Sequence, residues 1–240
     1  MDSPPPLDAA SRLRQALLAS APSARLQAAM SAGTHPRPEY IEVLVERCAN
    51  ESDLNVRETL TWALMRHPAE LTVPRLITET RSAIAQARSQ ALHTLSKVGD
   101  PDGWSAITPS VLDDADDNVA RTAWRVAAVL VPEGSETALA AALVHHLNRG
   151  DRDVQLSLSR SLITLGDAAL PPLEAAAESG DERRRVHAIA TMLLRESPDD
   201  GFDAALFDAE LRVLLSTPLD SSADPNSGQD PDADFRLDDS

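Results

Sequence analysis

The amino-acid sequence predicts an all-α protein in which helical pairs stack into an α-solenoid. Ala and Leu dominate the 240 residues, whereas only three Trp, three Phe and one Tyr occur. Helices packed through small side chains suit this composition better than sheets, which favour β-branched and aromatic residues. In addition, a pattern of apolar residues recurs about every 32 residues, which is typical of repeat proteins.

The repeated pattern is clearest in DLNVRETLTWAL, from Asp53 to Leu64. Counted from Val56, small or apolar residues occupy offsets 0, 4, 7 and 8, which form one stripe along a helix. The stripe recurs with the reference residues Ala24, Ala87, Val119, Val154 and Val186, and the copy at Ala24 matches with small residues only. Each copy therefore predicts one helix that faces the interior.

A further helix is predicted before each stripe except the first, over residues 38–49, 71–81, 103–113, 135–147 and 169–179. Pro- and Gly-containing turns separate the pairs. Asp53, Asp116 and Asp151 directly precede stripe helices, where a carboxylate can cap backbone N–H groups. Residues 202–215 are predicted to form a last amphipathic helix that closes the stack.

The two ends of the chain are predicted to lie outside the solenoid, which spans residues 10–215. Residues 1–9 are Pro-rich, and residues 216–240 are acidic with few apolar side chains. Such segments bury too little surface to offset the entropy of ordering, so we expect disorder in both. The acidic tail either keeps the protein soluble or occupies a basic spot formed by Arg121, Arg125 and Arg160.

The copy around Val56 also resembles a known repeat family. Asp53, Val56 and Arg57 form Asp-x-x-Val-Arg, followed by Ala/Leu spacing on a second helix. This pattern is similar to the HEAT repeat, especially its short bacterial type called PBS-lyase HEAT-like. The resemblance implies a right-handed solenoid of about six repeats. It also implies that Arg25, Arg57 and Arg88, together with Asp53, are structural residues that act between neighbouring repeats.

The sequence lacks signals of catalysis or metal binding, so we predict a protein that is not an enzyme and needs no cofactor or metal. No phosphate-binding Gly motif, nucleophile elbow or His-Glu-x-x-His occurs. His145 and His146 are adjacent, so on a helix they point about 100° apart and do not suit a shared metal ion. Cys48 is the only cysteine, and we expect a buried thiol.

Charge and hydropathy narrow the possible partners. The formal net charge is −16; residues 199–240 carry twelve acidic and two basic residues, and the remaining 198 carry 26 and 20, or −6. This balance of charges disfavours nucleic acid as a partner, because its binding depends on Lys and Arg.

No apolar run reaches the ~20 residues of a membrane helix, and no signal sequence is recognisable. We expect a cytoplasmic, monomeric protein, and 21 Arg against one Lys suggest a bacterial source.

A partner-binding face is predicted on the outward side of the stripe helices, at offsets 2, 5, 6 and 9. It comprises Met30, Trp62, Met65, His93, Arg121, Trp124, Arg125, Arg160 and Met192. Met and Trp beside Arg suit an adaptable protein-binding surface. The alternative is that Trp62 and Trp124 are buried between repeats, because large aromatic side chains usually find cover.

The predicted function is that of a non-enzymatic adaptor or assembly factor that binds a protein along this face. Two alternatives follow from the resemblance. HEAT-like solenoids include DNA glycosylases that remove alkylated bases, but these require a strongly basic groove. They also include subunits that help to attach bilins to phycobiliproteins, which requires a pigment-making host about which the sequence is silent.

Overall fold

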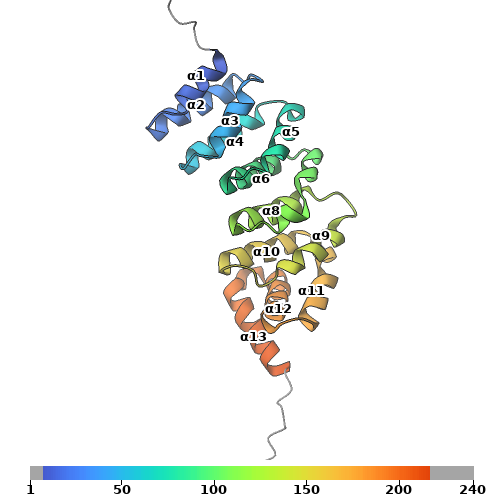
Figure 1. Cartoon of the computed structure of the whole chain (residues 1–240). Helices are drawn as coiled ribbons and strands as arrows, with labels where there is room; N and C mark the ends of the chain where they lie inside the picture. Colours follow the sequence, from blue (N-terminus) through green and yellow to red (C-terminus); the bar gives the residue numbers. More distant parts are fainter. Residues whose placement is uncertain (1–7, 217–240) are drawn as a thin grey trace, which may run out of the picture.

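The computed structural model describes residues 8–216, and every regular element in this range is a helix (Figure 1). The second helices of successive pairs contact one another along the stack: α2 (Pro22–Thr34), α4 (Leu54–Met65), α6 (Ala85–Val98), α8 (Asp117–Leu130), α10 (Arg152–Thr164) and α12 (Glu182–Glu196). The first helices form the other layer: α1 (Ala9–Ala16), α3 (Tyr40–Cys48), α5 (Ala69–Glu79), α7 (Pro109–Leu112), α9 (Glu136–Leu143) and α11 (Leu170–Glu178). The 3-10 helix η4 (Pro198–Asp200) leads into α13 (Phe202–Ser216), which packs on α12 at the end of the stack.

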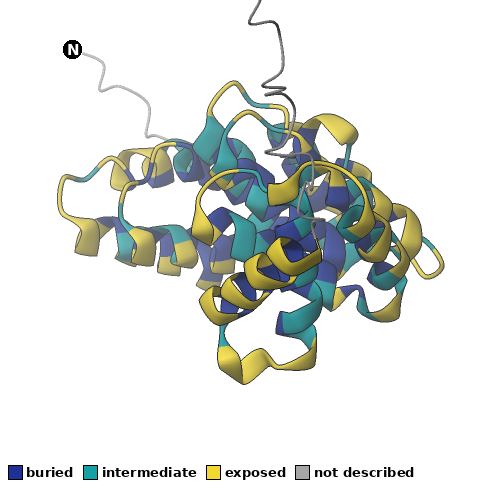
Figure 2. Cartoon of the chain, turned by 90° about the horizontal axis from the view of Figure 1, so that it is seen from below, coloured by how far each residue is buried: buried dark blue, intermediate teal, exposed yellow. Residues whose placement is uncertain are grey.

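Burial follows the predicted stripe along most of the chain. The stripes that begin at Val56, Ala87, Val119 and Val154 are buried at all four positions. In the stripe that begins at Val186, only Leu193 is half-buried. Seen from the end that α13 closes, buried residues gather in the middle of the molecule and exposed residues on its outside (Figure 2). The stripe therefore identifies the side of each of these helices that faces the core.

The stripe predicted at Ala24 is wrong by one residue. Helix α2 buries Arg25, Ala29, Ala32 and Gly33, whereas Ala24 is exposed. Small residues lie on several sides of α2, so hydropathy alone does not choose between its faces. Contact with α4 selects the face that carries Gly33.

The layer of first helices is irregular in the middle of the stack. The single helix predicted over 103–113 is replaced by the 3-10 helix η1 (Pro101–Ala106) and the four-residue α7. Pro109 begins α7, because proline suits the first turn of a helix but interrupts a continuous one. A cavity of about 760 Å³ separates η1 and α7 from α9, and Trp104, Leu112 and Leu139 line it. The other 3-10 helices of this layer are η2 (Val144–His146) and η3 (Gly166–Ala169).

The predicted N-caps are present. Asp53, Asp116 and Asp151 precede α4, α8 and α10, and each carboxylate accepts a hydrogen bond from the backbone N–H three residues later. The limits predicted for the solenoid shift slightly, because Asp8 caps α1 at Ala9 and α13 extends to Ser216. The remaining segments predicted to be disordered, 1–7 and 217–240, lie outside the described residues. In the described range no helix has the length and hydropathy needed to cross a membrane.

Buried polar side chains connect neighbouring second helices. Thr61 of α4 accepts a hydrogen bond from Gln90 Nε2 of α6 at 2.8 Å and lies 3.3 Å from Thr94 Oγ1. Ser159 of α10 contacts His187 and Thr191 of α12 at 3.0 and 2.8 Å. A buried hydrogen bond is satisfied only when its partners are in place, so these contacts fix how each helix sits on the next.

His187 is the one ionisable side chain among these contacts between second helices, and 1% of its surface is exposed. Its Nδ1 accepts a hydrogen bond from the backbone N–H of Asn148, and its Nε2 lies 3.0 Å from Ser159 Oγ. An accepting Nδ1 carries no proton, so the ring is neutral with its proton on Nε2. Burial lowers the pKa of His187 to about 4.

Candidate partner-binding face

The structure leaves most of the predicted partner-binding residues accessible. Met30, Trp62 and Met65 are 49%, 41% and 43% exposed, and Arg125 and Arg160 are exposed as well. His93 and Arg121 are half-buried. These side chains lie on α2, α4, α6, α8 and α10, so they follow the layer of second helices along the stack. We call this surface the second-helix face.

Trp124 does not belong to the second-helix face, and its assignment there is wrong. The side chain is fully buried, and its Nε1 donates a hydrogen bond to the backbone carbonyl of Leu112 at 2.9 Å. The ring of His146 lies 5.3 Å away, and the Arg149 guanidinium lies 5.8 Å from the Trp124 ring. Trp124 therefore belongs to the central core cluster, between the end of α7 and the segment that follows α9.

Met192 is only half-buried, but it packs against the central core cluster instead of standing free. Helix α12 is covered by α10, α11 and α13, which leaves little of its surface open. Met192 therefore offers less free surface to a partner than Met30 or Met65 does.

Trp62 is exposed, yet it also fills space between two helices. A Cβ atom at Gly33 would lie 2.3 Å from Cζ3 of Trp62 and 2.9 Å from Cα of Ala63. Both distances are far shorter than van der Waals contact, so only glycine fits here. One edge of the indole thus rests on the α2 backbone while the rest remains open to solvent.

The arginines predicted to be structural share one local contact. Arg25, Arg57 and Arg88 each donate through Nη1 to backbone carbonyls five or six residues earlier, in the turn before their own helix. This contact ties the turn to the first part of the helix. The three residues differ in what the rest of the guanidinium binds.

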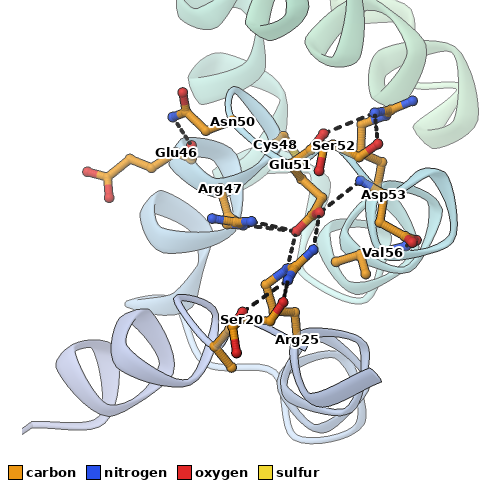
Figure 3. Close-up of polar contacts among 12 residues, drawn as sticks. Ser20, Arg25, Glu46, Arg47, Cys48, Asn50, Glu51, Ser52, Asp53 and Val56 are labelled. Atoms are coloured by element: carbon orange, nitrogen blue, oxygen red, sulfur yellow. Dashed lines mark hydrogen bonds and ion pairs between the residues drawn. The ribbon is translucent and has the colours of Figure 1, made fainter. Parts of the chain in front are cut away.

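Arg25 forms a buried ion pair with Glu51 of the next helical pair (Figure 3). Its Nε and Nη2 reach the two carboxylate oxygens at 2.8 and 2.7 Å, and Arg47 and the backbone N–H of Asp53 donate to the same carboxylate. Burial alone would raise the pKa of Glu51, but the hydrogen bonds from Arg25, Asp53 and Arg47 outweigh burial and lower the pKa to about 2. Glu51 therefore stays ionised although it is fully buried.

Arg88 repeats this arrangement with Asp114, whose oxygens lie 2.7 and 2.8 Å from Nε and Nη2. In both pairs the acidic residue follows the arginine by 26 positions. The position 26 residues after Arg57 is Ala83, which has no carboxylate. Arg57 consequently keeps only its backbone contacts among the described residues, and the rest of its guanidinium is available to a ligand.

A groove crosses α4, α6 and α8 on the second-helix face. It has a volume of about 490 Å³, and its charged lining residues are Arg57, Arg121, Arg125, Glu58 and Asp116. Asp116 is occupied as the cap of α8. The hydrogen bonds of Arg125 go to the Arg121 carbonyl and the Thr122 hydroxyl, and neither Arg125 nor Arg121 forms an ion pair within residues 8–216. Burial is the main cause that lowers the pKa of Arg125, and the positive charge of Arg121 lowers it further.

His93 stands in the wall of this groove between the arginines of α4 and α8. Its Nε2 atom is buried and lies 3.4 Å from a Glu58 oxygen, without a hydrogen bond of acceptable geometry. A buried ring nitrogen without a partner is costly, and a ligand that enters the groove could satisfy it. Arg160 lies on α10, outside the groove, and continues the cationic side of the face.

The described residues contain no cluster of His, Cys, Asp or Glu that could hold a metal ion. Cys48 is buried, and burial, together with the nearby Glu79 charge, raises the pKa of its thiol to about 12. A thiol with so high a pKa is a poor nucleophile.

No family model and no curated protein matches the sequence. Similar solved structures include the crystal structure of an engineered protein, at a TM-score of 0.46 and 17% identity, covering 87% of this chain and 98% of that one. A second engineered protein has a TM-score of 0.42 and 16% identity, covering 80% and 100%. The complex of CpcE and CpcF of the phycocyanin lyase from Nostoc sp. PCC7120 has a TM-score of 0.33 and 14% identity, covering 88% and 97%. At these values the likenesses carry no functional argument.

Proposed function

We propose that this helical repeat protein is a non-enzymatic adaptor, a right-handed solenoid of about six HEAT-like repeats that binds another protein on its second-helix face. The ligand is an acidic segment of the partner, held in the groove across α4, α6 and α8. Arg57, Arg121 and Arg125 bind its carboxylates, and Trp62 and Met65 supply an apolar contact beside the groove.

The observation that carries this proposal is the group of three groove arginines without an ion pair among the described residues. The chain has 38 acidic and 22 basic residues, so an intramolecular partner for an arginine is easy to supply. Arg25 and Arg88 have such partners, whereas the groove arginines form no ion pair with the described residues. Arginine binds carboxylates through paired, charge-assisted hydrogen bonds, which makes an anionic ligand the best fit.

The apolar part of the site lies on the same side of α4 as the groove. Glu58 lines the groove, Trp62 follows one helical turn later, and Met65 follows that. Aromatic and Met side chains next to arginine are typical of energetically important positions in protein interfaces. A segment that places a large apolar side chain a few residues from its carboxylates would use both parts.

The proposal is tested with two fluorescein-labelled peptides of twelve residues, one alternating Asp with Leu and one alternating Lys with Leu. We expect fluorescence anisotropy to show tighter binding of the Asp peptide, with affinity falling as salt increases. The double variant Arg121→Ala/Arg125→Ala should weaken this binding at least tenfold. Arg81→Ala, which removes an exposed arginine outside the groove, is the matched control.

Equal affinity of the double variant and the wild type for the Asp peptide would contradict the proposal. A labelled DNA duplex is measured in parallel, because the glycosylase alternative requires a basic groove that binds phosphates. Duplex binding that is tighter than Asp-peptide binding, and is lost in the same double variant, would favour that alternative.

A further inference from the structure

Helix α13 has two apolar sides, and only one of them is used inside the molecule. Phe202, Ala205, Leu206, Ala209 and Val213 are all buried in the terminal core cluster with α12. On the other side, Phe207, Leu211, Leu214 and Leu215 are 66%, 47%, 69% and 78% exposed. Contiguous exposed apolar side chains on a monomer mark an interaction site.

The exposed residues have the spacing of a helix-packing seam. Phe207, Leu211 and Leu214 are separated by four and three residues, so they form one stripe along α13. At 100° per residue, Asp208 lies at one edge of this stripe, and Asp203 and Glu210 lie at the other. We call Phe207, Leu211 and Leu214 with these flanking carboxylates the α13 seam.

The α13 seam forms one wall of a groove with a volume of about 690 Å³. The first turns of α10 and α12 form the other wall, and the buried side chains of Val186 and His187 reach the floor. The charged residues that line the groove are Asp151, Glu182, Glu210, Arg152 and Arg183. Arg152 lies 3.8 Å from Asp203 at the edge of the seam, so its charge is partly compensated. The groove is thus apolar in the middle, with three acidic and two basic side chains around it, and the carboxylates of Asp203 and Asp208 on α13 add negative charge beside the exposed apolar stripe.

A second copy of this chain does not fit the α13 seam electrostatically. Two α13 helices packed side by side would bring together Asp203, Asp208 and Glu210 from each copy, with only Arg212 on each helix to offset them. Like charges at positions that flank a helical seam oppose pairing. The net charge of −16 on each chain adds to the repulsion.

We infer that the α13 seam is a docking site for an amphipathic helix with a cationic border, supplied by a partner protein. The apolar side chains of that helix, at i, i+3 or i+4 and i+7, pack on Phe207, Leu211 and Leu214. Lys or Arg side chains beside its apolar stripe face the carboxylates of α13. This site is separate from the arginine groove, and the inference holds whether or not that groove binds an acidic segment.

The test uses a labelled fourteen-residue peptide with Leu at the two seam positions of each heptad and Lys elsewhere, and a matched peptide with Glu in place of Lys. We expect the Leu/Lys peptide to bind the full chain at least tenfold more tightly than the Leu/Glu peptide. The double variant Phe207→Ala/Leu211→Ala should weaken Leu/Lys binding at least tenfold. Leu18→Ala, which removes a 70% exposed leucine at the other end of the stack, should change it less than twofold.

A second variant separates the charges from the apolar contacts. Asp208→Asn/Glu210→Gln keeps the apolar residues of the seam but removes two of its flanking charges, so Leu/Lys binding should weaken and depend less on salt. Arg121→Ala/Arg125→Ala should leave this binding unchanged, which distinguishes the site from the arginine groove. Circular dichroism at 222 nm verifies that each variant is folded.

Two results would overturn the inference. One is Leu/Lys binding by Phe207→Ala/Leu211→Ala within twofold of the wild type. The other is a wild-type dimer in sedimentation velocity that the same double variant converts to monomer, since this would make a second copy the occupant.

Discussion

Acidification should destabilise the protein mainly through the buried His187, at pH values above those at which Glu51 contributes. His187 is buried and neutral, and its folded-state pKa of about 4 lies below the value of 6.5 expected in an unfolded chain. At pH 5 the unfolded chain therefore binds a proton that the folded protein rejects, so stability falls as the pH drops from 6.5 towards 4. The stabilisation from Glu51 is lost in a lower window, between its ordinary pKa of 4.5 and the folded value of about 2.

The size of the effect follows from the shift. With about 1.4 kcal/mol per pKa unit, His187 alone lowers the free energy of unfolding by about 2 kcal/mol between pH 7.5 and pH 5. Urea unfolding followed by circular dichroism at the two pH values measures this difference. His187→Asn is the informative variant, because the Asn oxygen can still accept the hydrogen bond from the Asn148 backbone but does not titrate.

Between pH 7.5 and pH 5, the free energy of unfolding of His187→Asn should fall by about 2 kcal/mol less than that of the wild type. Burial also lowers the pKa of His146, so the variant should keep a small dependence of the same sign. The exposed residue His35 gives a matched control in His35→Asn. Identical pH dependence of the wild type and His187→Asn would refute the assignment of the effect to His187.

Three further changes have expected outcomes. Gly33→Ala should lower the free energy of unfolding by about 1–3 kcal/mol and alter Trp62 fluorescence, since the new methyl group collides with the indole; unchanged stability would mean that the two helices separate freely. Ala83→Asp should give Arg57 the carboxylate that Arg25 and Arg88 have, adding about 1 kcal/mol of stability and weakening Asp-peptide binding; an effect on neither property would contradict the 26-residue relation. Leu60→Ala should cost about 2–5 kcal/mol because Leu60 is fully buried, whereas Trp62→Ala should cost less and weaken partner binding; equal losses in chemical denaturation would place Trp62 in the core.

The helical stripe could be predicted because its spacing depends on one helix at a time. Val56, Leu60 and Leu64 share a side of α4 whatever lies next to it, and all are buried. The first copy failed where this signal is weakest, since Ala24 and its neighbours are too small to indicate a face. There, contact between Gly33 and Trp62 on the adjacent helix decides which side of α2 is buried.

Trp124 and His187 could not be assigned from the sequence, because their environments depend on neighbouring elements. Trp124 is buried against Leu112 at the end of α7 and beside His146 and Arg149, which lie 22 and 25 residues later. His187 is held by Asn148 and Ser159, which lie 39 and 28 residues earlier. The missing partner of Arg57, in contrast, can be found in the sequence. A carboxylate follows Arg25 and Arg88 by 26 residues, whereas the residue at the same distance from Arg57 is Ala83.

The gap between η1–α7 and α9 makes the contacts between the two halves of the stack uneven. On one side, α8 and α10 are in direct contact. On the other, the cavity of about 760 Å³ replaces the side chains that would brace the two halves against each other. The two halves of the stack are therefore joined at this point mainly through the contact between α8 and α10. Arg125 on α8 and Arg160 on α10 lie on the two helices of that contact, so the layer of second helices alone sets their relative positions across the middle of the stack.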